Sequence, residues 1–350
     1  MNKNFKIVLS AGIILFLSIL LFGKNSILPN FNINKNQPNS VIQPDINSEL
    51  NPLTITAMRN RTYPGSNLNV KEKLANGANY DKYIVSYLSD GLKIYALLTV
   101  PNDIKPLQGW PAIIFNHGYI PPNIYQTTER YVNYVDAIAR SGFIVLKPDY
   151  RGNGNSDGQP EGAYYSPAYA SDVLNALSSI KQYKDVDPQK IGMWGHSMGG
   201  NIILRDIVVN TSDIKAAVIW GGVVGSYEDL MNNWQRKVNY QPLPTEMALR
   251  NNYRKRITDT YGTPQTNPAF WSSIDPTYFL SDIKTPTQLH TGGNDEEVPV
   301  SFSVSLKDKL IKEGKDVEYY NYPGGDHNIS SPNFETAMQR TIDFFNKYLK

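Results

Sequence analysis

The feature that most constrains this chain is the stretch at residues 190–200. An apolar run at residues 191–194 predicts a buried strand, and the apolar segment 201–209 predicts a core helix. Between them lies the pattern G-x-S-x-G at residues 195–199, with Ser197 at its centre. So sharp a turn strains the central residue, and its neighbours two before and two after must be small. The pattern predicts an elbow that lifts the Ser197 hydroxyl clear of a sheet, in front of a helix N-terminus that favours negative charge.

A serine at such an elbow is a poor nucleophile until a base removes its proton and a third group holds the base. The sequence has only four histidines. His196 adjoins the serine, so its ring diverges from it, while His117 follows an early strand and His290 lies inside one. His327 lies in a glycine-rich loop between the last predicted strand and the last predicted helix. We therefore expect His327 to be the base.

The acid is expected on the loop after the strand that precedes the base, because the chain order serine, acid, histidine fits the elbow. Residues 292–299 offer Asp295, Glu296 and Glu297. We choose Asp295, because it follows the glycines that a tight turn needs and is followed shortly by Val-Pro. Asp326 is the competing acid, but an acid adjacent in sequence to the base rarely reaches the far ring nitrogen.

The oxyanion of a tetrahedral intermediate needs two preorganised hydrogen-bond donors. The backbone N–H of Met198, directly after the nucleophile, is expected to supply one. The second is expected from the loop after the strand at residues 112–116, hence from the backbone of Gly118 or Tyr119. This chemistry needs no cofactor, and we predict none.

Asn153, Asn155, Asp157 and Gly158 imitate the start of a calcium-binding loop. Tyr164 stands where such a loop carries its twelfth-position glutamate. We therefore predict a network of turns that shapes the wall of the pocket, and no metal site.

Strand and helix patterns alternate along most of the chain, after a leading hairpin. Strands are expected at residues 83–88, 92–101, 112–116, 143–147, 191–194, 216–220, 287–290 and 317–322, and helices at 129–140, 168–180, 201–209, 301–313 and 333–349. Such alternation predicts an α/β fold, with a mostly parallel, doubly wound sheet of about eight strands and an antiparallel edge.

The alternation stops at about residues 226–281, which are rich in aromatic side chains and carry several arginines. This insertion follows the carboxyl end of a strand, where open α/β sheets place their ligands. We predict that it forms a helical lid over the site. Residues 51–81 are expected to form an accessory segment of irregular structure and a short helix, so that the main domain spans residues 82–350.

The N-terminus carries two lysines, an apolar run at residues 7–22 and a closing lysine. This pattern predicts a signal peptide or signal anchor at residues 1–24. The lack of a convincing cleavage pattern favours an uncleaved transmembrane helix, with the rest of the chain on the extracytoplasmic side of the membrane. Secretion after cleavage is the alternative. Residues 25–50 are rich in Asn, Pro, Gln and Ser, which predicts a disordered linker.

Composition excludes several kinds of function. Because the chain has no cysteine, it has no disulfide, no thiol nucleophile and no cysteine-based metal site. Its net charge of +2 gives no sign of a polyanionic partner, so no nucleic acid is expected.

Six short motifs carry a family resemblance: Asn-His-Gly at 116–118, Asp-Tyr-Arg-Gly at 149–152, Gly-His-Ser-Met-Gly-Gly at 195–200, Thr-Pro at 285–286, Gly-Asn-Asp at 293–295 with Val-Pro at 298–299, and Gly-Asp-His at 325–327. Together they resemble the catalytic domain of the prolyl oligopeptidase (S9) family, and they are similar to related dienelactone-hydrolase-like esterases. The resemblance covers roughly residues 80–350 and implies an α/β-hydrolase fold. It also implies that Ser197 is the nucleophile, that Asp295 and His327 are its partners, and that the His117 loop supports the oxyanion.

S9 oligopeptidases carry a large β-propeller before the hydrolase domain, which restricts them to short peptides. We expect no propeller here, because only a short stretch separates the predicted anchor from the first predicted strand. We expect a serine hydrolase that works through an acyl-enzyme, as an S9-like serine peptidase. A carboxylesterase acting on small acyl esters is the alternative, and a non-catalytic surface binding module is a remote one. The expected partners are thus a short peptide or a small ester, and a membrane through the N-terminal segment.

Overall fold

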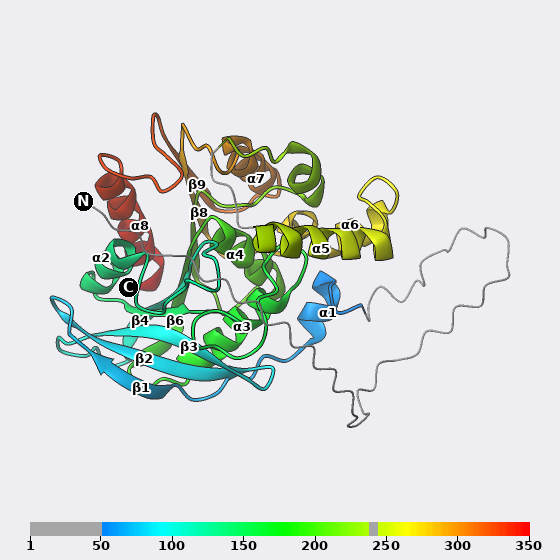
Figure 1. Ribbon diagram of the computed structural model, residues 1–350. Helices are drawn as coiled ribbons and strands as arrows, with labels where there is room; N and C mark the ends of the chain where they lie inside the picture. The colour runs from blue at the N-terminus through cyan, green and yellow to red at the C-terminus, as the bar shows by residue number, and fades with distance from the viewer. Residues whose placement is uncertain (1–50, 238–243) are drawn as a thin grey trace, which may run out of the picture. The chain divides into compact units, whose positions relative to one another are not determined.

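The computed structural model describes residues 51–237 and 244–350, which build one mixed sheet of nine strands with helices on both faces (Figure 1). The predicted anchor and linker, residues 1–24 and 25–50, lie outside the described residues. The strands lie in the order β1-β2-β3-β5-β4-β6-β7-β8-β9. Their bounds are Asn69–Leu74 (β1), Tyr80–Ser89 (β2), Leu92–Pro101 (β3), Trp110–Asn116 (β4), Ile144–Pro148 (β5), Val186–His196 (β6), Ala216–Trp220 (β7), Thr287–Gly292 (β8) and Val317–Tyr322 (β9).

The sheet is antiparallel at one edge and parallel elsewhere. The pairs β1–β2, β2–β3 and β3–β5 are antiparallel. All other neighbouring pairs, β5–β4, β4–β6, β6–β7, β7–β8 and β8–β9, are parallel. Each strand that the sequence predicts is present, because buried parallel strands are short apolar runs that stand out from their surroundings. The predicted mostly parallel, doubly wound sheet is confirmed.

β1 is the strand that the sequence analysis did not predict. Five of its six residues are exposed, so it lacks the apolar alternation that identifies a half-buried strand. Its backbone nevertheless pairs with β2 along most of its length, with an irregularity between Val70 and Glu72. The accessory segment expected at residues 51–81 therefore contributes a strand to the sheet, and the expected boundary at residue 82 falls within β2.

Helices cover both faces of the sheet (Figure 1). Their bounds are Ile55–Asn60 (α1), Val132–Arg140 (α2), Ala168–Lys181 (α3), Met198–Val209 (α4), Pro244–Tyr261 (α5), Pro268–Ile274 (α6), Val300–Lys312 (α7) and Phe334–Leu349 (α8). Of these, α5 and α6 belong to the insertion between β7 and β8. Apolar residues of α2 and α8 share one core cluster with the sheet. Apolar residues of α1, α3, α4 and α7 share the other. No helix in the described part of the chain is both long and apolar enough to span a bilayer.

The strand order reverses direction at β4, which lies between β5 and β6. Asn116 at the end of β4 is in register with Gly195 near the end of β6. The loop that begins at His117 therefore starts level with the elbow at Ser197. Open α/β sheets bind their ligands in the crevice at such a reversal.

The insertion at residues 226–281 connects β7 to β8 and is largely helical. It contains a π-helical turn at Asp229–Asn233, α5, α6 and two 3₁₀ turns at Pro276–Tyr278 and Leu280–Asp282. Arg205 of α4 donates hydrogen bonds to the Tyr227 hydroxyl at 2.9 Å and to the carbonyl of Ile274 at 3.2 Å. This buried arginine thus anchors two parts of the insertion to the helix that follows the elbow.

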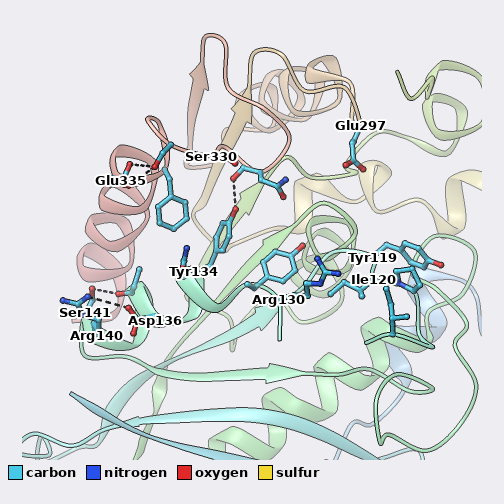
Figure 2. Close-up of a pocket in the computed structure, with 18 of the residues that line it drawn as sticks. Tyr119, Ile120, Arg130, Tyr134, Asp136, Arg140, Ser141, Glu297, Ser330 and Glu335 are labelled. Atoms are coloured by element: carbon cyan, nitrogen blue, oxygen red, sulfur yellow. Dashed lines mark hydrogen bonds and ion pairs between the residues drawn. The ribbon is translucent and has the colours of Figure 1, made fainter. Parts of the chain in front are cut away.

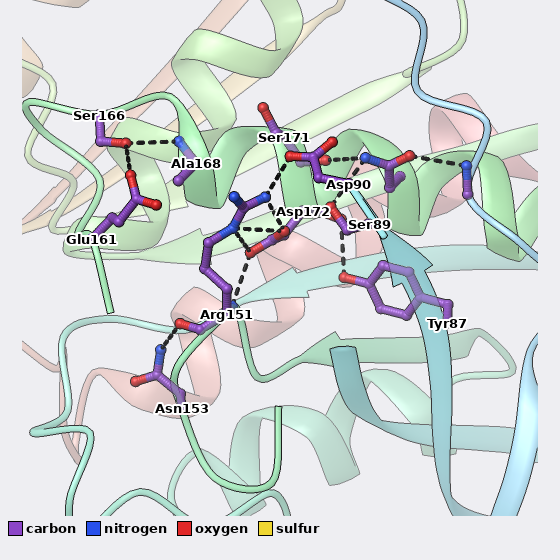
Figure 3. A network of polar contacts seen from close by, with 12 residues as sticks. Tyr87, Ser89, Asp90, Arg151, Asn153, Glu161, Ser166, Ala168, Ser171 and Asp172 are labelled. Atoms are coloured by element: carbon purple, nitrogen blue, oxygen red, sulfur yellow. Dashed lines mark hydrogen bonds and ion pairs between the residues drawn. The ribbon is translucent and has the colours of Figure 1, made fainter. Parts of the chain in front are cut away.

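A buried ion-pair network holds the segment 149–158 against α3 (Figure 3). The Arg151 guanidinium lies 2.7 Å from Asp172 of α3 and 2.7 Å from Asp90 in the β2–β3 turn. Asp90 also pairs with Arg61, which follows α1. Because the Asp172 side chain is fully buried, loss of the arginine would leave an uncompensated charge, which is strongly destabilising.

Candidate active site

The elbow has the strained geometry that its pattern predicts. Ser197 has φ 55° and ψ −116°, a conformation that is costly for a residue with a side chain. It is the one residue between Ile191 and Gly200 that is not buried. A Cβ added to Gly199 would lie 2.0 Å from the Asn116 carbonyl oxygen. The glycines are therefore required for the backbone to pass β4 closely enough to expose Ser197.

Hydrogen bonds fix the backbone around the elbow. The Ser197 N–H donates to the Trp220 carbonyl at 3.0 Å, and the Ser197 carbonyl accepts from Gly200 and Val223, each at 3.0 Å. Met198 is the first residue of α4, and N–H groups in the first turn of a helix have no intrahelical acceptor. The Met198 N–H therefore has no acceptor within the helix, and its role as an oxyanion donor stays a prediction.

His327 and Asp295 are in contact, as the sequence analysis expects. The His327 Nδ1 lies 2.8 Å from the Asp295 Oδ2. The other carboxylate oxygen, Oδ1, accepts from the N–H groups of Glu297 at 2.8 Å and Val298 at 2.9 Å. A carboxylate can only accept, so Nδ1 carries the proton, and Nε2 of the neutral ring is left as the acceptor. This tautomer is the one that a general base needs.

The competing acids have other partners. The Asp326 carboxylate accepts from the N–H and hydroxyl of Ser330, at 2.7 and 2.9 Å, and so stabilises the loop after His327. Glu296 is exposed. Glu297 pairs with Arg236 of the insertion.

The remaining histidines are buried and neutral. Burial lowers the pKa of each of them to about 3, helped by the charges of Lys147 for His117, of His327 for His196 and of Arg340 for His290. None is protonated near neutral pH, so each acts as a fixed hydrogen-bonding group. The His196 Nδ1 lies 2.7 Å from the Tyr131 hydroxyl.

The second oxyanion donor was expected from Gly118 or Tyr119, and both residues line the cavity that contains Ser197. The Gly118 N–H donates to the Tyr131 hydroxyl at 2.9 Å. This engagement favours Tyr119 over Gly118 as the second donor beside Met198, and both donors stay predictions.

Two cavities meet at this site. A small one of about 130 Å³ is lined by residues that include Ser197 and His327. A large groove of about 1220 Å³ adjoins it, bounded by α2, α8 and the loop after β9 (Figure 2). The two share Tyr119, Tyr131, Arg236, Glu297 and Asn328. A substrate whose reacting group lies in the small cavity can therefore extend into the groove.

Several residues that line the small cavity were not assigned to the site by the sequence analysis, among them Trp234, Arg236 and Tyr131. Trp234 and Arg236 lie in the insertion predicted as a lid, but nothing in the sequence distinguishes them from the other aromatic and basic residues there. Tyr131 reaches the site because Arg130 and Tyr131 both adopt a left-handed conformation, with φ 57° and 53°. No turn motif signals that conformation.

The calcium-like segment is a series of turns. The Asn153 amide donates to the Tyr169 hydroxyl at 3.1 Å, and Asp157 accepts from the Lys93 N–H at 2.9 Å. Within the part of the chain that the structure describes, no three acidic or histidine side chains gather as a metal site.

Comparison with known proteins agrees with this geometry. Residues 130–350 match the model of the prolyl oligopeptidase family. The chain is 25% identical over 240 residues to the uncharacterized peptidase YtmA of Bacillus subtilis, covering 69% of this chain and 83% of YtmA. It is 24% identical over 301 residues to the uncharacterized peptidase YuxL of the same organism, covering 80% of this chain but only 42% of YuxL.

A solved structure gives the same fold. The acetyl xylan esterase from Paenibacillus sp. R4 superimposes with a TM-score of 0.62 at 20% identity, over 84% of this chain and 92% of the esterase. The family match covers more than half of the sequence and includes the elbow and both loops that carry the His327–Asp295 pair. This chain belongs to the prolyl oligopeptidase family of α/β-hydrolases and is a serine hydrolase.

Proposed function

We propose that Ser197 is the nucleophile, His327 its general base and Asp295 the group that orients the base. The observation that carries this proposal is the strained Ser197, which lines one small cavity with a histidine whose Nδ1 is held by a buried carboxylate. Serine hydrolases on unrelated folds share this arrangement of roles.

In the proposed reaction the Ser197 Oγ attacks the substrate carbonyl carbon while His327 Nε2 takes the hydroxyl proton. The negative charge on the carbonyl oxygen is stabilised by the N–H groups of Met198 and Tyr119. The intermediate collapses as His327 gives its proton to the leaving amine or alcohol. Water then attacks the acyl-enzyme, its proton passing through His327 back to Ser197, and the acid product leaves.

We propose short peptides as the substrates, because the chain belongs to a peptidase family and its relatives YtmA and YuxL are described as peptidases. The groove of about 1220 Å³ is larger than a single residue needs and suits an extended chain.

The second candidate is a carboxylesterase for small acyl esters. The observation that favours it is the volume beside Ser197, about 130 Å³, well below the roughly 300–1,000 Å³ of typical ligand pockets. Such a cavity encloses only a small group. The acetyl xylan esterase with the same fold is named for such a substrate, a short acyl ester on a large alcohol.

We further propose that residues 1–24 hold the enzyme at a membrane with its catalytic domain outside the cytoplasm. The support is the apolar run between lysines in the sequence. Mass spectrometry of the N-terminus from cell fractions tests it: an intact N-terminus in the membrane fraction is expected, and full-length protein confined to the cytosol would contradict it.

The substrate class is tested by comparing turnover of short-chain p-nitrophenyl esters with that of aminoacyl and dipeptidyl p-nitroanilides, by the wild type and Ser197→Ala. Ser272→Ala, on α6, is a control for the substitution itself. Anilide cleavage that disappears only with Ser197→Ala supports the peptidase. Ester cleavage alone supports the second candidate, and turnover that persists in Ser197→Ala would overturn both.

A further inference from the structure

A continuous chain of hydrogen bonds connects the oxyanion loop to the loop of the base. The Gly118 N–H donates to the Tyr131 hydroxyl at 2.9 Å, and this hydroxyl lies 2.7 Å from the His196 Nδ1. On the other side of the ring, the His196 Nε2 lies 3.0 Å from the His327 carbonyl oxygen. The loop after β4, the elbow and the loop of His327 are thus joined through the partly buried Tyr131 and the buried His196.

The direction of every bond in this chain follows from its two ends. A carbonyl oxygen can only accept, so the His196 Nε2 carries the proton and its Nδ1 is the acceptor of the neutral ring. The Tyr131 hydroxyl therefore donates to His196 and accepts from Gly118. Because burial lowers the pKa of His196 to about 3, the ring is neutral near neutral pH and keeps this single tautomer.

The peptide unit after Gly118 is fixed from its carbonyl side. The His117 Nδ1 lies 2.7 Å from the Gly118 carbonyl oxygen, and the His117 ring is stacked between Tyr125 and Tyr150, with ring centroids 4.7 and 4.3 Å away. A trans peptide unit is planar, so fixing its C=O also fixes the opposite N–H. That N–H belongs to Tyr119, the proposed oxyanion donor.

The atoms around Gly118 leave no space for a side chain at this position. A Cβ added there would lie 2.6 Å from the Tyr131 hydroxyl and 3.2 Å from the Ser197 Cβ. Tyr131 reaches this position through the left-handed backbone of Arg130 and Tyr131, a conformation that is costly for residues with a side chain. The neighbouring residues Val135 and Ile138 of α2, buried in the core, hold that backbone in place.

We propose that Tyr131 is a positioning residue for catalysis: with His196 it locks the loop at residues 117–119 to the loop of His327, so that the Tyr119 N–H meets the oxyanion without rearrangement. The inference rests on the proposed function, because it assumes that an oxyanion forms beside Ser197. Tyr131 does not touch the reacting atoms. It acts through Gly118 and His196.

Tyr131→Phe tests the proposal, because it removes one oxygen atom and leaves the ring. We expect kcat on the wild-type substrate to fall about 10- to 100-fold with KM within about twofold, since preorganised donors act on the transition state. The affinity of phenylboronic acid, which forms a tetrahedral adduct with an active serine, is expected to weaken by a similar factor. A purely structural role would lower the melting temperature without this parallel loss.

Tyr80→Phe is the matched control, because the Tyr80 hydroxyl donates to Asp136 on the same helix, α2, at 2.8 Å. It removes a hydrogen bond from α2 without touching the loop, and kcat should stay within about twofold. His196→Gln, which keeps one acceptor and one donor, should retain more activity than His196→Ala. These two variants test the hydrogen-bond chain from Gly118 to His327 even where Tyr131→Phe unfolds.

The outcomes separate this inference from the proposed function. Suppose that Ser197→Ala shows no turnover, while Tyr131→Phe keeps both its kcat and its phenylboronic acid affinity within twofold of wild type. This result would overturn the positioning role of Tyr131 and leave the proposed function standing. Turnover and boronate binding that survive in Ser197→Ala would overturn the proposed function itself, and the positioning role with it.

Discussion

Burial sets the ionisation of the individual residues that carry polar contacts in this molecule. Neutral His117 and His196 serve as fixed donors and acceptors around the elbow. Asp206 of α4 is a different case: it is fully buried, and neither carboxylate oxygen has a hydrogen-bond partner among the described residues. Burial raises its pKa well above the ordinary value, although the Arg205 charge opposes this. Asp206 is therefore held in the protonated form.

Asp206→Asn should stabilise the protein increasingly as pH rises. Below the ordinary pKa of about 4 the Asp206 carboxyl is protonated in both the folded and the unfolded protein. There the difference in free energy of unfolding between the wild type and Asp206→Asn changes little with pH. Above it, only the unfolded chain releases the proton, which favours unfolding of the wild type by at most about 1.4 kcal/mol per pH unit. Urea unfolding of both proteins between pH 4 and pH 7 measures the difference.

Asp213→Asn is the control, because its effect on the free energy of unfolding should change with pH in the opposite direction to that of Asp206→Asn. Partial burial raises the pKa of Asp213, but hydrogen bonds from Asn210 and Lys181 outweigh it and hold the pKa below the ordinary value. Its stabilisation is present at neutral pH and is lost as pH falls, so this variant should be destabilised at pH 7 and approach the wild type in acid. A pH-independent effect of Asp206→Asn would contradict a protonated buried carboxyl.

At the scale of elements, the insertion contacts the loop that carries Asp295. The Trp234 Nε1 donates to the Glu297 carbonyl at 2.8 Å, and the Lys237 N–H donates to the Glu296 carbonyl at 2.8 Å. Arg236 pairs with the Glu297 side chain, and both residues line the small cavity and the groove. This arrangement makes the start of the insertion a wall between the two spaces.

Arg236→Ala should widen the small cavity towards the groove. We expect the ratio of kcat/KM for p-nitrophenyl butyrate to that for p-nitrophenyl acetate to rise by about tenfold, since a methylene in a pocket is worth roughly 10- to 200-fold. Lys237→Ala, at the exposed neighbouring position, should leave the ratio unchanged. An unaltered ratio in Arg236→Ala would mean that Arg236 does not limit the acyl group.

The elements and contacts that the sequence predicts are those with a local signal. Buried strands, the elbow at Ser197, and the loops of Asp295 and His327 each carry their own pattern of apolar residues or glycines, and the structure brings the last two into contact. β1 carried no such signal, because its side chains are exposed. The bond from Gly118 to Tyr131 was equally hidden, because it depends on how α2 packs on the sheet.

At the scale of the whole molecule, the segment before the main domain is part of the fold. Ile55 and Met58 of α1 are buried in the same core cluster as α3 and α4. The Arg59 guanidinium donates to the Val208 carbonyl at the end of α4, at 2.6 and 2.9 Å. Residues 51–81 therefore stabilise the helix that follows Ser197.

Ile55→Ala should destabilise the protein by about 2–5 kcal/mol, because a fully buried side chain is lost and a cavity remains. Leu107→Ala, where the leucine is 96% exposed, should change the free energy of unfolding by less than about 0.5 kcal/mol. Chemical denaturation compares the two. Equal, small effects would show that α1 does not contribute to the stability of the domain.

The most direct test of the central claim is covalent trapping of Ser197 by a fluorophosphonate, followed by intact-mass and peptide analysis. The account predicts one phosphonyl group per chain, located on Ser197 and absent from Ser197→Ala. Labelling of His327→Ala and Asp295→Asn should be slower by at least about 100-fold, because the hydroxyl is then no longer activated. Labelling at another residue, or at an undiminished rate without His327, would contradict the account.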